Sequence, residues 1–145
     1  MERKIYAKSA GACNCINLRR ASRAITEFYD QALAPSGLKT TQFSLLRHII
    51  RLGPLNMSEL AKAIRLDRTT LARNVKVLEA QGFIAITTGK DSRTRQLNIS
   101  EKGQKAVEGA NQYWTEAQES LKEYLGEEQL RTLMGLLLKI EEIVP

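Results

Sequence analysis

Two amphipathic segments separated by only three residues constrain the fold of this chain more than any other feature. The first begins at Asn56, whose side chain can cap a helix while Glu59 reaches back to the same turn, as in a capping box. After the connection Arg65-Leu66-Asp67, Asp67 is a good N-cap for a second helix, and Gly82 is typical of the position that follows a helix. Two helices joined by so short a turn predict a helix-turn-helix.

A β-hairpin is predicted directly after this pair of helices. Residues 83–88 and 96–99 are strand-like, and the polar stretch 89–95 between them supplies a long charged tip. Ser100, followed by Glu101, restarts a helix that keeps helical spacing to Gly126. A helix-turn-helix followed by such a hairpin predicts a winged helix-turn-helix.

The remaining segments also have helical periodicity. We expect a first helix over residues 12–33, a second that is capped by Thr40 or Thr41 and stops at Gly53-Pro54, and a last one over residues 127–144. The predicted fold class is mainly α with a small β-hairpin. The expected organisation is an N-terminal dimerisation helix (1–37), a winged helix-turn-helix domain (38–103) and C-terminal dimerisation helices (104–145), all in one intertwined unit.

The last helix carries more apolar residues than a lone peripheral helix should expose to water. We therefore expect it to pack against a second copy of the chain, which makes the protein a homodimer. The residues predicted to form this contact are Leu130, Leu133, Met134, Leu137 and Ile140.

The charge of the chain is unevenly distributed. Overall there are 22 Lys and Arg against 16 Asp and Glu, a net charge of +6. Between Lys39 and Lys105 there are 13 basic and 5 acidic residues, whereas residues 106–145 hold 3 basic and 8 acidic ones. A basic middle segment favours a polyanionic partner such as nucleic acid.

The second helix of the pair presents side chains that suit a DNA groove. Arginine can bridge a guanine edge, asparagine an adenine edge, threonine can meet a thymine methyl group, and lysine neutralises phosphate. The predicted DNA contacts on this helix are Arg68, Thr69, Thr70, Arg73, Asn74 and Lys76. Taken alone, such a helix would more often be an ordinary solvated face.

The hairpin tip adds a second basic element. Lys90, Arg93 and Arg95 follow the helix closely, where an arginine could enter the minor groove, and Asp91 is placed to hold Arg93. A basic hairpin by itself usually protects a sheet edge from aggregation. The two elements together indicate double-stranded DNA more strongly than either does alone.

The sequence resembles the MarR family of winged helix-turn-helix regulators. The stretches that carry the resemblance are MSELAKAIRLDRTTLARNVKVLEAQGFI and DSRTRQLNISEKG. The family's wing pattern is met by Asp91, Arg93, Leu97, Ile99, Ser100 and Gly103. Ile86 departs from it, because many relatives have a basic residue there.

This resemblance implies a two-fold dimer held by the first and last helices. Two recognition helices roughly 34 Å apart meet successive major grooves, so the expected operator is a pseudo-palindromic inverted repeat with half-sites about 10 bp apart. We expect a transcriptional regulator, in family habit a repressor. A winged-helix module for protein–protein contact is the alternative, although its wing and recognition helix would normally be less basic.

Two kinds of release signal are predicted. Cys15 through Tyr29 resembles the first helix of the peroxide-sensing OhrR branch, and Arg19, one turn after Cys15, would favour the thiolate. The preferred interpretation, however, is that Cys13 and Cys15 are small, half-buried packing residues at a helix start. Alternatively, Arg20, Tyr29 and His48, together with Arg19, could line a pocket for a small aromatic ligand.

Other classes of protein find less support in the sequence. We expect no catalytic residues and no cofactor, because the chain has neither a Gly-rich phosphate loop nor paired carboxylates in a plausible pocket. Two cysteines and a single histidine give no spacing for a metal site. No apolar run has the roughly 20 residues that a membrane span needs, so we expect a cytoplasmic protein.

Overall fold

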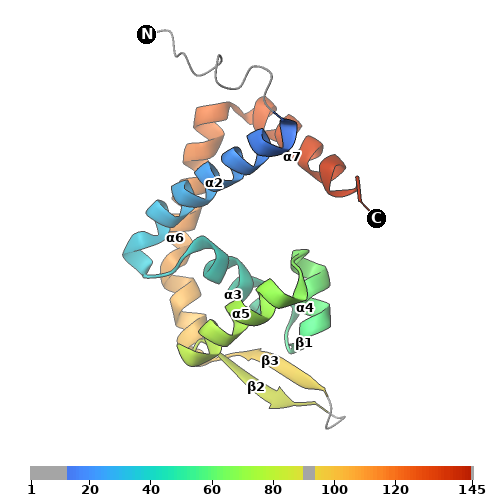
Figure 1. Cartoon of the computed structure of the whole chain (residues 1–145). Coiled ribbons are helices and arrows are strands. Elements are labelled where there is room, and N and C mark those ends of the chain that lie inside the picture. Colours follow the sequence, from blue (N-terminus) through green and yellow to red (C-terminus); the bar gives the residue numbers. More distant parts are fainter. Residues whose placement is uncertain (1–12, 90–93, 145) are drawn as a thin grey trace.

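The computed structural model describes residues 13–89 and 94–144. Most of these residues are helical, and a small antiparallel sheet lies at one end of the molecule (Figure 1). The elements in chain order are α2 (Asn14–Leu33), η1 (Ala34–Ser36), α3 (Thr40–Leu52), β1 (Leu55–Asn56), α4 (Met57–Ile64), α5 (Arg68–Ala80), β2 (Ile84–Thr88), β3 (Arg95–Ile99), α6 (Glu101–Leu125) and α7 (Glu127–Glu141). We call α3 to β3 the winged unit. The predicted fold class is confirmed.

The helix-turn-helix forms as its capping residues predict. The Asn56 side chain accepts a hydrogen bond from the backbone N–H of Glu59 at 2.8 Å, and the Glu59 carboxylate accepts one from the N–H of Asn56 at 3.2 Å. Asp67 accepts from the backbone N–H of Thr70 at 2.8 Å and so begins α5. Between the helices, Arg65 adopts a left-handed conformation with a φ of 57°. Each cap satisfies N–H groups that the helix itself leaves without a partner.

The sheet has three strands, one more than the predicted hairpin. Its order is β1-β3-β2, and both pairs of neighbours are antiparallel. Leu97 in the central strand pairs with Leu55 on one side and with Ile86 on the other. The strand β1 was missed because it has only two residues, too few for an alternating pattern. It ties the wing to the residues that begin α4.

The core of the winged unit lies between the helix pair, α3 and the sheet. Leu60 from α4 packs with the inward residues of α5, which are Leu71, Val75 and Leu78, and each of these is at most 1% exposed. Burial of such side chains contributes about 1.5–3 kcal/mol each. This packing fixes the angle between the two helices.

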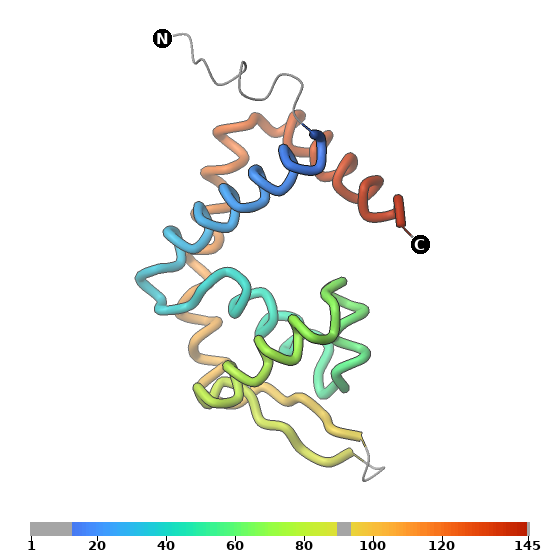
Figure 2. The backbone as a smooth tube through the Cα atoms, in the orientation of Figure 1, coloured from blue at the N-terminus to red at the C-terminus, as the bar shows by residue number. Residues whose placement is uncertain are grey.

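Helix α6 connects the winged unit to the rest of the molecule. Figure 2 follows α6 from the sheet to the opposite end of the chain, where α2 lies beside it and α7 begins. Gly126, with a φ of 88°, ends α6 and lets α7 leave in a new direction. No residue of α7 is buried in the single chain.

Three predicted helix boundaries were wrong. Helix α2 begins at Asn14, with Cys13 as its N-cap, and residue 12 lies outside the described residues. Helix α3 is preceded by Lys39 instead of Thr40 or Thr41, because the N–H of Lys39 donates to Gln42 Oε1 and the N–H of Thr40 donates to Asp30. Helix α7 ends at Glu141, earlier than the predicted residue 144.

Across the described residues, no helix combines the length and the apolar character that crossing a membrane requires.

Two glycines of α6 allow a test of this packing. A Cβ at Gly103 would overlap the Phe83 carbonyl oxygen and lie 2.7 Å from Ile99 Cδ1, whereas a Cβ at Gly109 would meet open space. We expect Gly103→Ala to lower the free energy of unfolding by about 2 kcal/mol or more. Gly109→Ala should raise it by about 0.5–1 kcal/mol through helix propensity. Urea denaturation measures both, and equal effects would contradict the described junction.

Candidate nucleic-acid interface

Helix α5 has one buried side and one exposed side. Because consecutive residues lie 100° apart around a helix, the buried stripe Leu71, Val75 and Leu78 leaves the opposite side to solvent. Thr69, Arg73 and Lys76 occupy that side and are exposed, and Arg68 is exposed at the start of the helix. The structure therefore presents two cations and a hydroxyl group on one outward strip of α5.

Two residues predicted to face outward lie at the border of the buried side. Thr70 and Asn74 are only partly exposed, because they flank the stripe that includes Leu71 and Val75. The hydroxyl group of Thr70 also donates to Asp67 Oδ2 at 2.7 Å, so it takes part in the cap. We correct the sequence-based description accordingly, and the fully outward set on α5 is Arg68, Thr69, Arg73 and Lys76.

The basic wing is described only in part. Lys90, Asp91 and Arg93 lie outside the described residues. Arg95 lies within β3 instead of the hairpin tip, because the strand register pairs it with Thr88. Its side chain is exposed. Gly89 N–H donates to the Thr94 carbonyl oxygen at 2.7 Å and closes the base of the loop.

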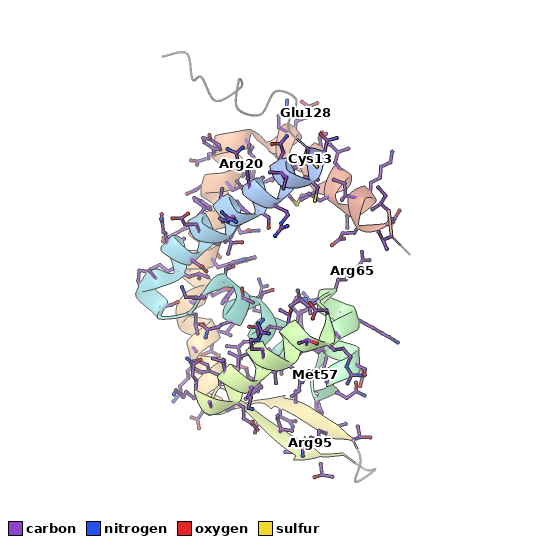
Figure 3. All side chains as sticks on the ribbon, in the orientation of Figure 1. Cys13, Arg20, Met57, Arg65, Arg95 and Glu128 are labelled. Carbon is purple, nitrogen blue, oxygen red and sulfur yellow. The ribbon has the colours of Figure 1, made fainter. Side chains whose placement is uncertain are left out.

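A groove of about 780 Å³ separates α5 from the wing. Arg68 and Arg95 contribute cations to its lining from opposite sides, one from the helix and one from the sheet. In Figure 3, Met57 marks the start of α4 and Arg95 marks the wing. The full lining is Asn56, Met57, Ser58, Arg68, Thr69, Ala72, Ile86, Thr94, Arg95 and Leu97.

Sequence reasoning missed several residues of this groove. Met57, Ala72, Ile86 and Leu97 supply apolar lining. The N-terminus of α4 also reaches the groove through Ser58. These positions come together only because β1 joins the sheet next to α4, a pairing that no sequence pattern indicated.

A second, smaller cavity of about 300 Å³ lies where α2, α3 and α6 meet. It brings together Tyr29 and His48, two of the residues predicted to line a ligand pocket, whereas Arg20 is exposed and is not part of the lining. The cations at this cavity are Arg47 and Arg51. Its lining is Tyr29, Thr40, Phe43, Ser44, Arg47, His48, Arg51, Trp114 and Gln118.

The polar groups of this cavity are held by specific contacts. The guanidinium of Arg47 lies 4.2 Å from the ring centroid of Trp114 and 5.6 Å from that of Phe43. Tyr29 donates a hydrogen bond to Gln118 Oε1, and partial burial raises the pKa of its hydroxyl group. His48 Nδ1 lies 2.7 Å from the Ser44 carbonyl oxygen.

Cys13 and Cys15 are free thiols and both are exposed in the single chain. The interpretation of them as half-buried packing residues is therefore wrong for the chain alone. Cys13 has an extended conformation as the N-cap, whereas Cys15 lies inside α2 and Arg19 follows one turn later. Figure 3 shows Cys13, Arg20 and Glu128 at the end of the molecule opposite the wing.

Comparison with known proteins identifies the family. The model of the MarR family matches residues 36–94, which run from η1 to the base of the wing. The transcriptional regulator MosR of M. tuberculosis, solved in complex with DNA, is 36% identical, with a TM-score of 0.78 over 90% of this chain and 97% of that one. This chain belongs to the MarR family. As a MarR-family protein it is a winged helix-turn-helix transcriptional regulator.

Further relatives agree with this assignment. YwoH of Bacillus subtilis, an HTH-type transcriptional regulator, is 26% identical over 94 residues, which span 65% of this chain and 69% of YwoH. The transcriptional repressor CouR, bound to a 23-mer DNA duplex, is 24% identical, with a TM-score of 0.81 over 92% of this chain and 96% of that one. The likeness to CouR supports the fold alone.

The cap of α5 predicts a dependence of stability on pH. Hydrogen bonds from the backbone N–H and then the hydroxyl group of Thr70 lower the pKa of Asp67 from its ordinary value of 3.8. The stabilisation is therefore complete above pH 3.8 and disappears as the pH falls through the lower pKa of the folded state. Asn in its place would cap without titrating.

We expect Asp67→Asn to melt at a lower temperature than the wild type at about pH 7, with the gap narrowing by about pH 2. Circular dichroism melts across this range measure the difference. Glu59→Gln, at the cap of α4, serves as the matched control for a general loss of carboxylate. A gap of constant size at every pH would contradict the assigned pKa.

Proposed function

We propose that this MarR-family protein binds an inverted-repeat operator as a homodimer and thereby regulates transcription, most simply as a repressor. The observation that carries the proposal is the outward strip of α5 beside a groove with an arginine on each side. Arg73 and Lys76 stand on the strip, and Arg68 and Arg95 contribute to the groove. Such a surface offers base contacts from the helix and phosphate contacts from the groove.

Each group has a distinct role in this proposal. Arg73 and Thr69 contact base edges in the major groove, where a guanidinium can bond a guanine and a threonine methyl group can meet thymine. Lys76, Arg68 and Arg95 neutralise phosphates. Lys90 and Arg93 enter the minor groove from the wing, as we expect from the sequence. The apolar groove lining, with Ile86, faces the sugars of the strand between them.

The dimer is proposed from the apolar surface of α7. Leu133, Met134, Leu137 and Ile140 are between 37% and 43% exposed in the single chain, and Leu130 lies on the same helix. A second copy would cover this surface, with α2 and α6 contributing from residues 1–37 and 104–145. The segment 106–145 is also the acidic part of the chain, which keeps the dimerisation helices away from the DNA.

An operator-binding regulator of this kind needs no catalytic group and is expected in the cytoplasm, where it reaches its DNA.

The alternative to a DNA-binding regulator is a winged-helix module that contacts another protein. The exposed arginines of α5 and the groove favour DNA, because apolar or acidic surfaces would suit a protein partner better. The two classes differ in whether one duplex sequence is preferred over all others.

Binding to an operator selected from random duplexes tests the proposal. By fluorescence anisotropy, Arg73→Ala should cost about 1–3 kcal/mol and relax the preference at one base pair per half-site. Arg93→Ala should weaken binding to all duplexes and reduce the slope of log affinity against log salt by about one per contact.

Two controls sharpen this experiment. Arg131→Ala removes an exposed charge on α7, remote from the proposed surface, and should leave the affinity unchanged. A duplex with only one half-site should bind far more weakly than the inverted repeat, since only a dimer uses both. Affinity that is unchanged in both arginine variants, or equal for one and two half-sites, contradicts the proposal.

Release from DNA is proposed to depend on oxidation of Cys15, with an aromatic ligand in the cavity of α2, α3 and α6 as the second candidate. The exposure of the Cys15 thiol and the nearby Arg19 favour the first. The thiolate would attack the O–O bond of an organic peroxide, giving a sulfenic acid and releasing the alcohol. Tyr29, His48, Arg47 and Arg51 would hold the carboxylate and ring of a ligand.

Cumene hydroperoxide and salicylate distinguish the two signals. We expect the peroxide to release operator DNA from the wild type but not from Cys15→Ser, while Cys13→Ser shows how far the neighbouring thiol contributes. Salicylate should then act equally on wild type and Cys15→Ser if the cavity is the sensor, and Arg47→Met should abolish its effect. Equal release of wild type and Cys15→Ser by peroxide would exclude Cys15.

A further inference from the structure

An ion pair links the turn of the helix-turn-helix to the far end of the chain. Arg65 Nη1 lies 3.0 Å from Glu141 Oε2, and the two residues are 76 positions apart. The other two ion pairs among the described residues, Lys105–Glu101 and Arg131–Glu127, each join neighbouring turns of one helix. Figure 3 shows Arg65 at the edge of the winged unit that faces the end of α7.

The position of Arg65 couples this ion pair to the recognition helix. Arg65 follows directly on α4, and Asp67, two residues later, caps α5. The turn is stiff, because Arg65 N–H donates to the Ala61 carbonyl oxygen and Asp67 bonds both the N–H and the hydroxyl group of Thr70. A restraint on the backbone at Arg65 is therefore passed on to the start of α5.

Arginine is not the residue that this backbone conformation favours. Among the described residues other than glycine, only Arg65 has a positive φ, and glycine or asparagine would adopt it more readily. A left-handed arginine is therefore less favourable than a glycine at the same position. A contact made by the side chain, such as the pair with Glu141, offsets this cost.

The surroundings of the pair are complementary in charge. Lys62 in the last turn of α4 and Arg68 at the start of α5 lie on either side of Arg65 in the chain, whereas Glu142 follows Glu141 at the end of α7. Lys139 is the cation nearest in sequence on α7. The end of α7 is thus acidic, and the charged residues around Arg65 are basic except for Asp67.

We propose that Arg65 and Glu141 are positioning residues for operator binding, and this rests on the proposed function. Their ion pair, which we call the strut, holds the start of the recognition helix at a fixed place relative to α7. Because α7 carries the proposed dimer contact, one strut in each protomer sets the separation and angle of the two recognition helices. A protein that holds this geometry before binding loses less freedom when it meets the operator.

The strut is expected to act through geometry, because an exposed pair is weak. The side chains of Arg65 and Glu141 are 60% and 48% exposed, and such pairs contribute about 1.4-fold to fivefold in an equilibrium constant. A dimer has two struts, so their loss should weaken operator binding by about twofold to twenty-fivefold. The effect should shrink as salt screens the pair.

Arg65→Gly is the decisive variant. It removes the guanidinium and suits the left-handed turn, so the melting temperature should stay the same or rise while operator affinity falls. A role limited to stability would change both in the same direction. Arg65→Glu and Glu141→Arg should each weaken operator binding, and the double swap should restore it to within about twofold of the wild type.

Matched controls separate the strut from general electrostatics. Lys62→Glu makes the same change of charge three residues from Arg65, and Glu142→Arg does so next to Glu141. Loss of affinity for a random duplex should be the same in Arg65→Glu and Lys62→Glu, whereas loss for the operator should be greater in Arg65→Glu. Equal losses for the operator, or a double swap that restores nothing, overturn the proposal.

Hydrogen–deuterium exchange tests the strut without DNA. Amides near the end of α7 should exchange faster in Arg65→Gly and Glu141→Arg than in the wild type or Glu142→Arg, and the double swap should reverse the change. If the wild type prefers no duplex, the proposed function fails while exchange still decides whether the strut holds. Unchanged exchange in every variant would overturn the strut.

Discussion

The burial of one stripe of α5 against α4 is the interaction on which the rest of the structure depends. Leu60, Leu71, Val75 and Leu78 are almost fully removed from solvent, and together they fix how the two helices cross. Once this stripe is inside, helical geometry leaves Thr69, Arg73 and Lys76 no place except the surface. The exposure of the cations is thus a consequence of apolar packing, and the regulator needs no separate device to present them.

The two ends of the molecule also differ in charge. The winged unit holds the excess of basic residues, while α6 and α7 hold half of the 16 acidic ones. Helix α6 spans the distance between them and keeps the acidic end away from the wing (Figure 2). The proposed dimer contact and the proposed DNA-binding surface therefore lie in different parts of one short chain, and the acidic part is not the part that we propose to meet DNA.

Local signals were sufficient to predict most of the fold. Asn56, Asp67 and Ser100 cap the helices that they were expected to cap, because a cap depends on side chains three residues apart. The start of α3 was predicted wrongly because Asp30 of α2 satisfies the N–H of Thr40, and a partner ten residues away leaves no local pattern. The strand β1 escaped notice for a similar reason, since its pairing with β3 spans about forty residues of sequence.

The candidate site, like the fold, could be predicted only in part from the sequence. The cations of α5 follow from helical spacing, and the partial burial of Thr70 and Asn74 shows the limit of that argument, which locates a side but not its edges. The groove and the cavity could not be foreseen. Arg47 and Trp114 lie 67 positions apart in sequence, and Met57 meets Leu97 only through the sheet. Both sites form where the fold brings together segments that are far apart in sequence. A resemblance to relatives predicts that fold, but it does not predict which side chains line each site.

The two-residue strand β1 has a consequence for how a duplex would be recognised. Through the pairs Leu55–Leu97 and Asn56–Gln96, β3 of the wing shares a backbone ladder with the strand that leads into α4, so the hairpin is tied to the helix pair. A hairpin that is tied in this way has less freedom to change its distance from α5 than a hairpin without such pairing. The duplex would then have to deform to fit the protein, and the energy of that deformation depends on the DNA sequence. Duplex stiffness would therefore contribute to sequence preference together with contacts to the bases.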